Sequence, residues 1–504
     1  MRDRDAAYNN MFRANAASAL LLQLVSAAVG IILPRLILGA YGSEANGLVS
    51  SITQFLSYIA LMEAGTGSVM RAAMYKPLAD GDMLKLSGVV NACRRFFCGI
   101  AFAFLGYLAI LAFAYPLLAK NENFSYDFIL TLVLILGINT LTQYFLSLAN
   151  TLLLQAHQKI YISNLLEIGT LIVNLILSVI LIRSGAELRV LKLMTALLFL
   201  VRPGIIYVYV KKRYAIDKTV PPDNTAVSQR WDGLGHHLAF FAHKNTDVVV
   251  LTFFSTYQEI SVYSVYIMVT NAIQMALNSI SSSITAKLGD LFVRNDRDGL
   301  ERSFARHETL TYVVATLLFS VTNVMIVPFV GVYTQDITDV NYLRQGFSLL
   351  MVLAEFIYAV RAPYSNLAFA VGAFKDTRNG ALIEAVINIL VSLALVSWLG
   401  ISGVAVGTLI AMLYRTVDYV IYLSKNILCR PLKHFARNVS LSAVSYVLIS
   451  IVGGVLVVPL FKMNDLFNWA VCAAIITAIA TMILCAVQLM FNRKSFLDSF
   501  KLFI

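Results

Sequence analysis

Residues 160–213 read IYISNLLEIGTLIVNLILSVILIRSGAELRVLKLMTALLFLVRPGIIYVYVKKR. This stretch holds two apolar runs, 160–182 and 188–210, which are separated by a short link and followed by the basic cluster Lys211-Lys212-Arg213. Each run has the roughly 20 residues that an α-helix needs to cross a hydrocarbon core about 30 Å thick. The stretch therefore predicts two helices that cross a membrane one after the other.

The same pattern continues along the whole chain of 504 residues. Hydrophobic residues make up 59% of it and charged residues only 13%, with a mean hydropathy of +0.75, whereas soluble domains are about 45–50% apolar and 25% charged. We predict an all-α polytopic membrane protein with about 14 transmembrane helices and no large separate water-soluble domain. The predicted spans are 14–38, 47–67, 96–118, 128–154, 160–182, 188–210, 238–256, 262–286, 307–330, 343–369, 380–398, 402–424, 439–460 and 467–490.

Basic residues gather on one side of the predicted membrane. Of the 39 Lys and Arg, 28 lie in the amino terminus, alternate links and carboxyl tail, 6 belong to the opposite face and 5 lie inside spans. Because cytoplasmic loops are the basic ones, we predict that both termini are cytoplasmic, with the net charge of +11 facing an anionic leaflet. Charges dispersed over loops do not indicate a nucleic-acid partner. The five cysteines lack metal-ligand spacing, so we expect no disulfide, metal site or cofactor.

The chain also repeats itself at an offset of about 215 residues. Each unit holds six helices, an even number, so both units have the same topology and form lobes related by an axis along the membrane normal. The repeat divides the chain into 1–235, an N-terminal lobe, 236–437, a C-terminal lobe, and 438–504, two added helices with a cytoplasmic tail. Two such lobes suit alternating access. The matched pairs are Asn174 with Asn388, Ser178 with Ser392, Glu167 with Glu384, Thr195 with Thr408, Arg202 with Arg415, Tyr209 with Tyr422 and Glu44 with Glu259.

We single out five cations within predicted spans, where a charge costs on the order of 3 kcal/mol on insertion scales. We predict a cationic cavity for an anionic cargo such as a diphosphate, because guanidinium groups pair phosphate oxygens. The alternatives are that these side chains snorkel to the interface or join helices through ion pairs. The five cations are Arg35, Arg202, Lys244, Arg361 and Arg415.

Spacing along the helix separates these cations into two groups. The pairs with the i,i+3 spacing of an ion pair are Arg415 with Asp418 and Lys244 with Asp247. Arg202 and Arg361 lack an acid at that spacing and are the better substrate candidates.

Acidic and amide side chains inside spans are candidates for binding a coupling Na⁺ or H⁺, since carboxylates with nearby oxygens suit hard cations. The candidates are Asp247, Glu384, Asn388, Asp418 and Glu355, with Asp247 beside Thr246 and Glu384 beside Asn388 as the preferred pairs. The alternative is a structural hydrogen bond between helices. No glycine-rich phosphate loop is present in the sequence, so we expect the energy to come from an ion gradient, the membrane potential or consumption of the product.

Four stretches resemble the Wzx-type polysaccharide flippases, and the likeness extends over nearly the whole chain. They are NGLVSSITQFLSYIALMEAGTGSVMRAAMYKPLADGD (46–82), NTDVVVLTFFSTYQEISVYSVYIMVTNAI (245–273), FVGVYTQDITDVNY (329–342) and LGISGVAVGTLIAMLYRT (399–416). The resemblance implies a member of the multidrug, oligosaccharidyl-lipid and polysaccharide exporter superfamily in a bacterial plasma membrane. It implies translocation of polyprenyl-diphosphate-linked oligosaccharide, an O-antigen or lipopolysaccharide precursor, and makes other polysaccharide assembly proteins candidate partners. No single residue role transfers, because the shared patterns are diffuse.

Two other functions stay open beside the flippase. A multidrug or other small-molecule exporter on the same scaffold would handle cationic drugs and should present an acidic or aromatic cavity, which the five deep cations disfavour. A membrane polysaccharide polymerase normally carries its catalytic groups in a large outer loop, and the outer links here are short. We therefore expect a transporter that is not an enzyme.

Overall fold

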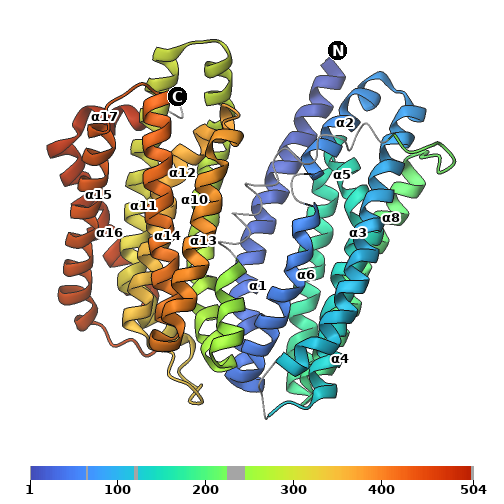
Figure 1. The fold of residues 1–504 in the computed structure, drawn as a ribbon, viewed down its shortest axis with the longest axis horizontal. Coiled ribbons are helices and arrows are strands. Elements are labelled where there is room, and N and C mark those ends of the chain that lie inside the picture. The colour runs from blue at the N-terminus through green and yellow to red at the C-terminus, as the bar shows by residue number, and fades with distance from the viewer. Residues whose placement is uncertain (1, 64–65, 119–122, 224–244, 501–504) are drawn as a thin grey trace. The chain divides into compact units, whose positions relative to one another are not determined.

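The described part of the chain is helical and falls into two compact units. In the computed structural model, residues 2–63, 66–118, 123–223 and 245–500 are described, and their regular structure is helical throughout. The units are Met1–Leu238 and Ala239–Ile504 (Figure 1).

The first unit begins with two spans that read as one ribbon. Helix α1, Arg2–Ser57, is interrupted at Gly42, whose φ of 80° and ψ of 174° are not helical. Glycine takes such a positive φ without the clash that a Cβ would cause. The predicted spans 14–38 and 47–67 are therefore the two arms of α1, the second of them extended by a 3₁₀ turn. The remaining elements are η1 (Tyr58–Glu63), α2 (Thr66–Asp80), α3 (Met83–Leu118), α4 (Tyr126–Thr142), η2 (Gln143–Ser147), α5 (Leu148–Ala156), α6 (Ile160–Arg183), α7 (Leu188–Phe199) and α8 (Val201–Arg213).

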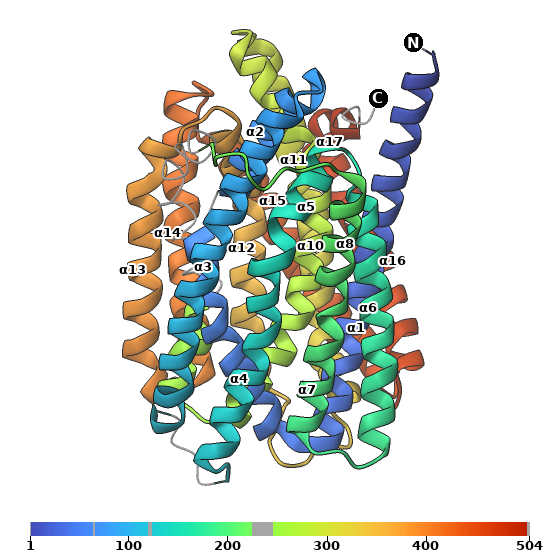
Figure 2. The same ribbon diagram turned by 90° about the vertical axis from the view of Figure 1, so that its right-hand side faces the viewer.

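Several predicted spans of this unit consist of more than one element. Helices α4 and α5 join through the π-helical segment η2 into the span predicted at 128–154. Helices α7 and α8 form the span predicted at 188–210 and are separated at Leu200, three residues before Pro203, whose ring removes a helix donor. Figure 2 shows α7 running beside α4 and α6, the helices that it contacts.

The second unit repeats the succession of long helices and adds two. An apolar helix, Asn245–Phe254, precedes them. The other elements are α10 (Tyr257–Val293), α11 (Arg297–Tyr333), α12 (Gln345–Ala370), α13 (Phe374–Leu399), α14 (Ile401–Asn426), α15 (Lys433–Ile451), η4 (Val452–Val457), η5 (Val458–Leu460), α16 (Leu466–Phe491) and α17 (Arg493–Ser499).

Helices α13 and α14 pack closely because α14 carries Gly403 and Gly407 on the face that meets α13. A Cβ at Gly403 would lie 2.5 Å from the Leu395 carbonyl oxygen, and one at Gly407 would lie 2.8 Å from the Ser392 backbone nitrogen. Small residues four apart let membrane helices approach in this way. This close approach of the two helices holds the polar residues of α13 against those of α14.

Twelve described helical stretches are long and apolar enough to cross a membrane. One of them, Asn10–Glu63, contains the two arms of α1, and the shorter apolar helix Asn245–Phe254 lies at the end of the span predicted at 238–256. The all-α polytopic fold with about fourteen spans is thereby confirmed, and the chain is a multi-pass membrane protein.

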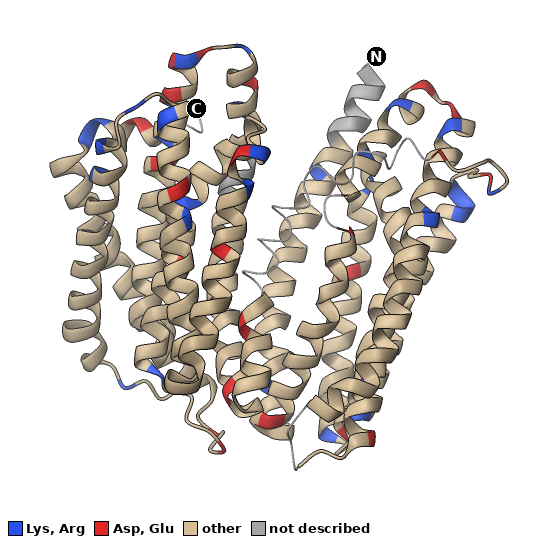
Figure 3. Cartoon of the chain, viewed as in Figure 1, with Lys and Arg blue, Asp and Glu red and all other residues tan. Residues whose placement is uncertain are grey.

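Lys and Arg concentrate at one end of each unit (Figure 3). In the first unit this is the end where α2 meets α3 and where α8 ends, and in the second it is the end where α10 meets α11. Such an asymmetry is typical of the cytoplasmic ends of membrane helices. The cytoplasmic placement of the termini stays a prediction.

Candidate functional site

The predicted cations divide between the two units. Arg35 lies half-buried in α1 and Arg202 lies in α8, whereas Arg361 lies in α12 and Arg415 in α14. Lys244 lies outside the described residues. The last three arginines all form ion pairs within their own unit.

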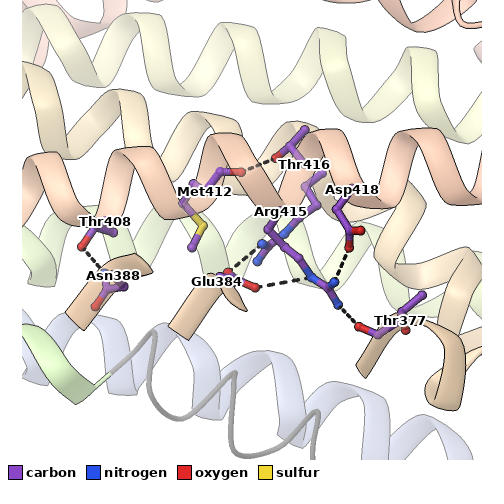
Figure 4. Close-up of polar contacts among 9 residues, drawn as sticks. Thr377, Glu384, Asn388, Thr408, Met412, Arg415, Thr416 and Asp418 are labelled. Carbon is purple, nitrogen blue, oxygen red and sulfur yellow. Dashed lines mark hydrogen bonds and ion pairs between the residues drawn. The ribbon is translucent and has the colours of Figure 1, made fainter. Parts of the chain in front are cut away.

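In the second unit, Glu384 stands between two arginines. Its Oε1 accepts a hydrogen bond from Arg361 Nη1 at 2.8 Å, and its Oε2 lies 3.4 Å from Arg415 Nε. Arg415 also pairs with Asp418 and donates to the Thr377 carbonyl at 2.8 Å (Figure 4). The side chains of Arg415, Glu384 and Arg361 are 1%, 7% and 9% exposed. We call these five residues the Glu384 cluster.

The Glu384 cluster ties α12, α13 and α14 together. Its two arginines are balanced by Glu384 and Asp418, so its formal charges cancel. Buried charges persist when they are paired and hydrogen-bonded, and removing one partner typically costs about 3–5 kcal/mol. A phosphate could reach Arg361 or Arg415 only by displacing Glu384 or Asp418.

The first unit carries the repeat-related pair in a more open setting. Arg202 Nη2 lies 2.8 Å from Glu167 Oε2 and 3.2 Å from Ser163 Oγ. The side chains of Arg202 and Glu167 are 21% and 34% exposed. Arg202 Nε is buried with no hydrogen-bond partner in the described structure. This N–H is unpartnered but shielded, so a further acceptor reaches it only if the surrounding side chains move.

The ion pairs partly follow the helix-spacing argument. The expected contact of Arg415 with Asp418 is confirmed. Arg202 and Arg361 have no acid at the i,i+3 spacing, but Glu167 and Glu384 reach them from neighbouring helices, which spacing within one helix does not reveal. Their role as substrate residues stays a prediction.

A second polar site in the second unit centres on Asp247, which is only 4% exposed. Its Oδ2 accepts hydrogen bonds from the Tyr263 hydroxyl at 2.9 Å and from the Thr408 hydroxyl at 3.0 Å. Asn388 donates from Nδ2 to Thr408 Oγ1 at 2.9 Å, while its own Oδ1 is buried without a described partner. Three segments far apart in sequence thus bring oxygen atoms to one carboxylate.

A cavity of about 20 Å³ lies beside this carboxylate, between Asp247, Tyr263, Thr408 and Glu355. A space of roughly 10–15 Å³ suffices for one water molecule, so this cavity has room for a single water or a small cation. Hard cations prefer carboxylate, amide and hydroxyl oxygens, and those are the groups present. Within the described residues, no three His, Cys, Asp or Glu side chains gather into a metal site.

The ion-binding candidates therefore separate into two sets. Asp247, Asn388 and Glu355 lie at or near the small cavity, whereas Glu384 and Asp418 hold arginines. The preferred pairing of Glu384 with Asn388 is not the one formed, because Glu384 turns to Arg361 and Asn388 turns to Thr408. Asp247 contacts Tyr263 and Thr408 from other helices.

Sequence reasoning missed one buried ion pair. Arg430 Nη2 lies 2.8 Å from Glu308 Oε1, and the Tyr364 hydroxyl donates to the same oxygen at 2.6 Å. The side chains of Arg430 and Glu308 are 4% and 1% exposed. Arg430 lies in the link between the predicted spans 402–424 and 439–460, and only its place in the fold buries it. This pair joins the link after α14 to α11 and α12.

No family model and no curated protein matches the chain. Solved structures share its fold. The lipid II flippase MurJ in an inward closed conformation superposes with a TM-score of 0.70 at 14% identity, covering 94% of this chain and 98% of that one. An inward-facing multidrug resistance MATE family transporter of the MOP superfamily gives 0.62 at 14% identity, over 80% and 94%. The Vibrio cholerae MATE transporter VcmN in the bent form gives 0.51 at 15%, over 84% and 98%.

These likenesses establish the class of fold. It is a membrane fold found in a flippase for a lipid-linked molecule and in multidrug transporters. At such low identity, the cargo has to be argued from this chain's own residues.

Proposed function

We propose that this chain is a flippase that moves a polyprenyl-diphosphate-linked oligosaccharide from the cytoplasmic to the outer leaflet of a bacterial plasma membrane by alternating access. The observation that carries the proposal is the extent of the likeness to the lipid II flippase, which covers 94% of this chain. The 6% of this chain that the likeness leaves uncovered is shorter than the segment 433–491, which holds the two added helices. The likeness therefore includes at least part of that segment. The MATE structures cover 80% and 84%.

The first unit offers the better diphosphate contact. The Arg202–Glu167 pair is partly exposed, and Arg202 keeps one unpartnered N–H. A phosphate oxygen can compete with Glu167 for the exposed part of the Arg202 guanidinium, and a shift of the side chain would add the Nε hydrogen as a second donor. The Glu384 cluster, whose Arg415, Glu384 and Arg361 side chains are at most 9% exposed, supports the fold of the second unit instead.

A cavity whose wall is mostly apolar, with Asn323, Gln345, Ser348 and Ser450 as its polar residues, supports a lipid cargo. It measures about 560 Å³ and lies in the second unit between α11, α12 and the segment from α15 to η5, with Val327, Leu349 and Val458 in its wall. Aliphatic side chains around such a space suit part of a prenyl chain, since burial of apolar surface is favourable in proportion to its area.

We place the coupling cation, Na⁺ or H⁺, at Asp247. The Asp247 carboxylate, the Tyr263 and Thr408 hydroxyls and the Glu355 carboxylate line a space for one ion, and Asn388 supports the site by donating to Thr408. A cation held there links the Asn245–Phe254 helix to α10, α12 and α14, so its binding can bias one conformation of the unit over another.

The test is the sidedness of lipid-linked oligosaccharide in cells that lack this chain. We expect precursor to accumulate on the inner leaflet, surface glycan to be lost and the wild-type gene to restore it. Arg202→Ala should restore much less than the exposed control Lys212→Ala at equal membrane level. Normal surface glycan without the chain, in a strain with no second flippase, contradicts the proposal.

The MATE structures make multidrug export the second candidate. It predicts that loss of the chain increases sensitivity to cationic drugs and leaves surface glycan intact. The flippase proposal predicts the reverse, so one strain distinguishes the two.

A further inference from the structure

The first unit contains a cavity that the proposed function does not use. It measures about 310 Å³ and is formed by residues of both arms of α1 and of α4, α6 and α7. Pockets for small ligands usually measure about 300–1,000 Å³. The cavity is therefore large enough for a group of monosaccharide size.

Lys192 is the one charged residue in the wall of this cavity. It lies near the start of α7, and the described residues give it no acidic partner. The wall contains no carboxylate at all. A lysine within a membrane helix is normally paired with an acid or directed at a ligand or a water-filled space, and here the cavity is what it faces.

Two buried polar groups in the same wall also lack partners. Asn174 and Ser178, one turn apart on α6, are 3% and 0% exposed. Asn174 Oδ1 and Ser178 Oγ have no hydrogen-bond partner in the described structure. Buried polar atoms are almost always satisfied, so a pair of unsatisfied ones beside an unpaired ammonium group indicates a missing ligand.

The internal repeat gives this cavity a counterpart with the opposite charge. Asn174 and Thr195 match Asn388 and Thr408, which belong to the Asp247 site. The offset that relates the two threonines places Ala405 at the position of Lys192, and Ala405 lines the second cavity. The second unit thus has carboxylates and no lysine where the first has a lysine and no carboxylate.

We propose that the Lys192 cavity binds an oxyanion, a carboxylate or phosphate group, through the Lys192 ammonium and the Ser178 hydroxyl, while Asn174 Oδ1 accepts a hydrogen bond from a hydroxyl of the molecule that carries the anion. A Ser hydroxyl can donate to such a group, and the oxygen of an Asn amide is an acceptor. The anion can come from a charged sugar of a glycan or from a free inorganic ion. The proposal goes beyond the flippase function, because it concerns a separate site and holds for any cargo.

The test is ligand binding to the full-length chain in detergent, followed by its melting temperature and by calorimetry. The probes are glucuronate, its neutral analogue glucose, and inorganic phosphate. We expect saturable stabilisation by glucuronate and none by glucose. Phosphate equal to glucuronate identifies a free-anion site, and glucuronate alone identifies a charged-sugar site. No difference between glucuronate, phosphate and glucose in the wild-type chain overturns the proposal.

Variants then assign the site. Lys192→Met should weaken binding about tenfold or more, since it removes the charge-assisted hydrogen bond, while Lys192→Arg should retain most of it. Lys212→Met, an exposed lysine of the same unit, is the control and should bind as the wild type. If Lys192→Met does not fold, Ser178→Ala should still weaken anion binding. Wild-type binding by both Lys192→Met and Ser178→Ala contradicts the assignment. Transport is not needed for this assay, so its failure leaves the flippase proposal standing.

Discussion

The two units carry the same arginine–glutamate pair in different surroundings. In the first unit Arg202 and Glu167 are 21% and 34% exposed and stand alone, whereas in the second Arg415 and Glu384 are 1% and 7% exposed and share a second arginine and a second acid. The same contact is thus buried within the Glu384 cluster in the second unit and partly exposed in the first. The accessible copy is the one that a charged cargo can reach.

The cavities differ in the same instructive way. The repeat places the matched hydroxyls of Thr195 and Thr408 in both walls, but one wall adds Lys192 and the other adds Asp247. The backbone arrangement is shared, and a few side chains decide which sign of charge the site accepts.

The largest expected change in stability comes from breaking the Glu384 cluster. Glu384→Gln leaves Arg361 and Arg415 without their shared acid in a buried setting, and we expect a loss of about 3–5 kcal/mol in the free energy of unfolding. Denaturation by SDS in mixed micelles measures it. A loss below about 1 kcal/mol, the range of exposed pairs, contradicts the view that the second copy is structural.

The close contact of α13 with α14 comes next. Gly407→Ala brings a methyl group against Ser392 and should cost about 1–3 kcal/mol through overpacking. The repeat places Met194 at the matching position of the first unit, where it is 41% exposed. Met194→Ala is therefore the matched control and should unfold close to the wild type. Equal losses in both variants argue that the two units pack alike.

The Asp247 site predicts a smaller, ion-specific effect. Sodium, or acidification if H⁺ is the coupling ion, should stabilise the wild-type chain, and Asp247→Asn should weaken that response about tenfold, equivalent to about 1.4 kcal/mol. Melting temperatures in sodium against choline chloride, and across pH, measure it. Asp290→Asn, at an exposed position of α10, should respond as the wild type. An unchanged response in Asp247→Asn places the cation elsewhere.

The smallest expected effect is on the accessible pair. Glu167→Gln should lower the free energy of unfolding by about 0.2–1 kcal/mol, as for partly exposed ion pairs. It should leave Arg202 freer to bind an anion and so not reduce surface glycan, unlike Arg202→Ala. Measuring unfolding and surface glycan on the same variants separates the two roles. A stability loss as large as that of Glu384→Gln removes the distinction between the units.

Much of the fold could be predicted because hydropathy is a local property of the chain. In the described residues, each apolar run corresponds to a helix, an arm of one or a succession of shorter helical elements, and even the α1 kink falls between two predicted spans at Gly42. Site residues depend on what other helices bring. Arg361 has no acid at the i,i+3 spacing because its partner Glu384 lies on another helix, and Lys192, near the start of the predicted span 188–210, was not among the five candidate cations. Only packing shows which cations are neutralised.

Reconstitution tests the central claim most directly. The purified chain would be placed in liposomes with a fluorescent polyprenyl-diphosphate-linked oligosaccharide, and a membrane-impermeant glycosidase would report how much of it crosses the bilayer. We expect the wild-type chain to carry the labelled lipid across far faster than protein-free liposomes, and Arg202→Ala to carry it more slowly. A folded wild-type chain that leaves the distribution unchanged, under a sodium gradient and under a proton gradient alike, would contradict the flippase account.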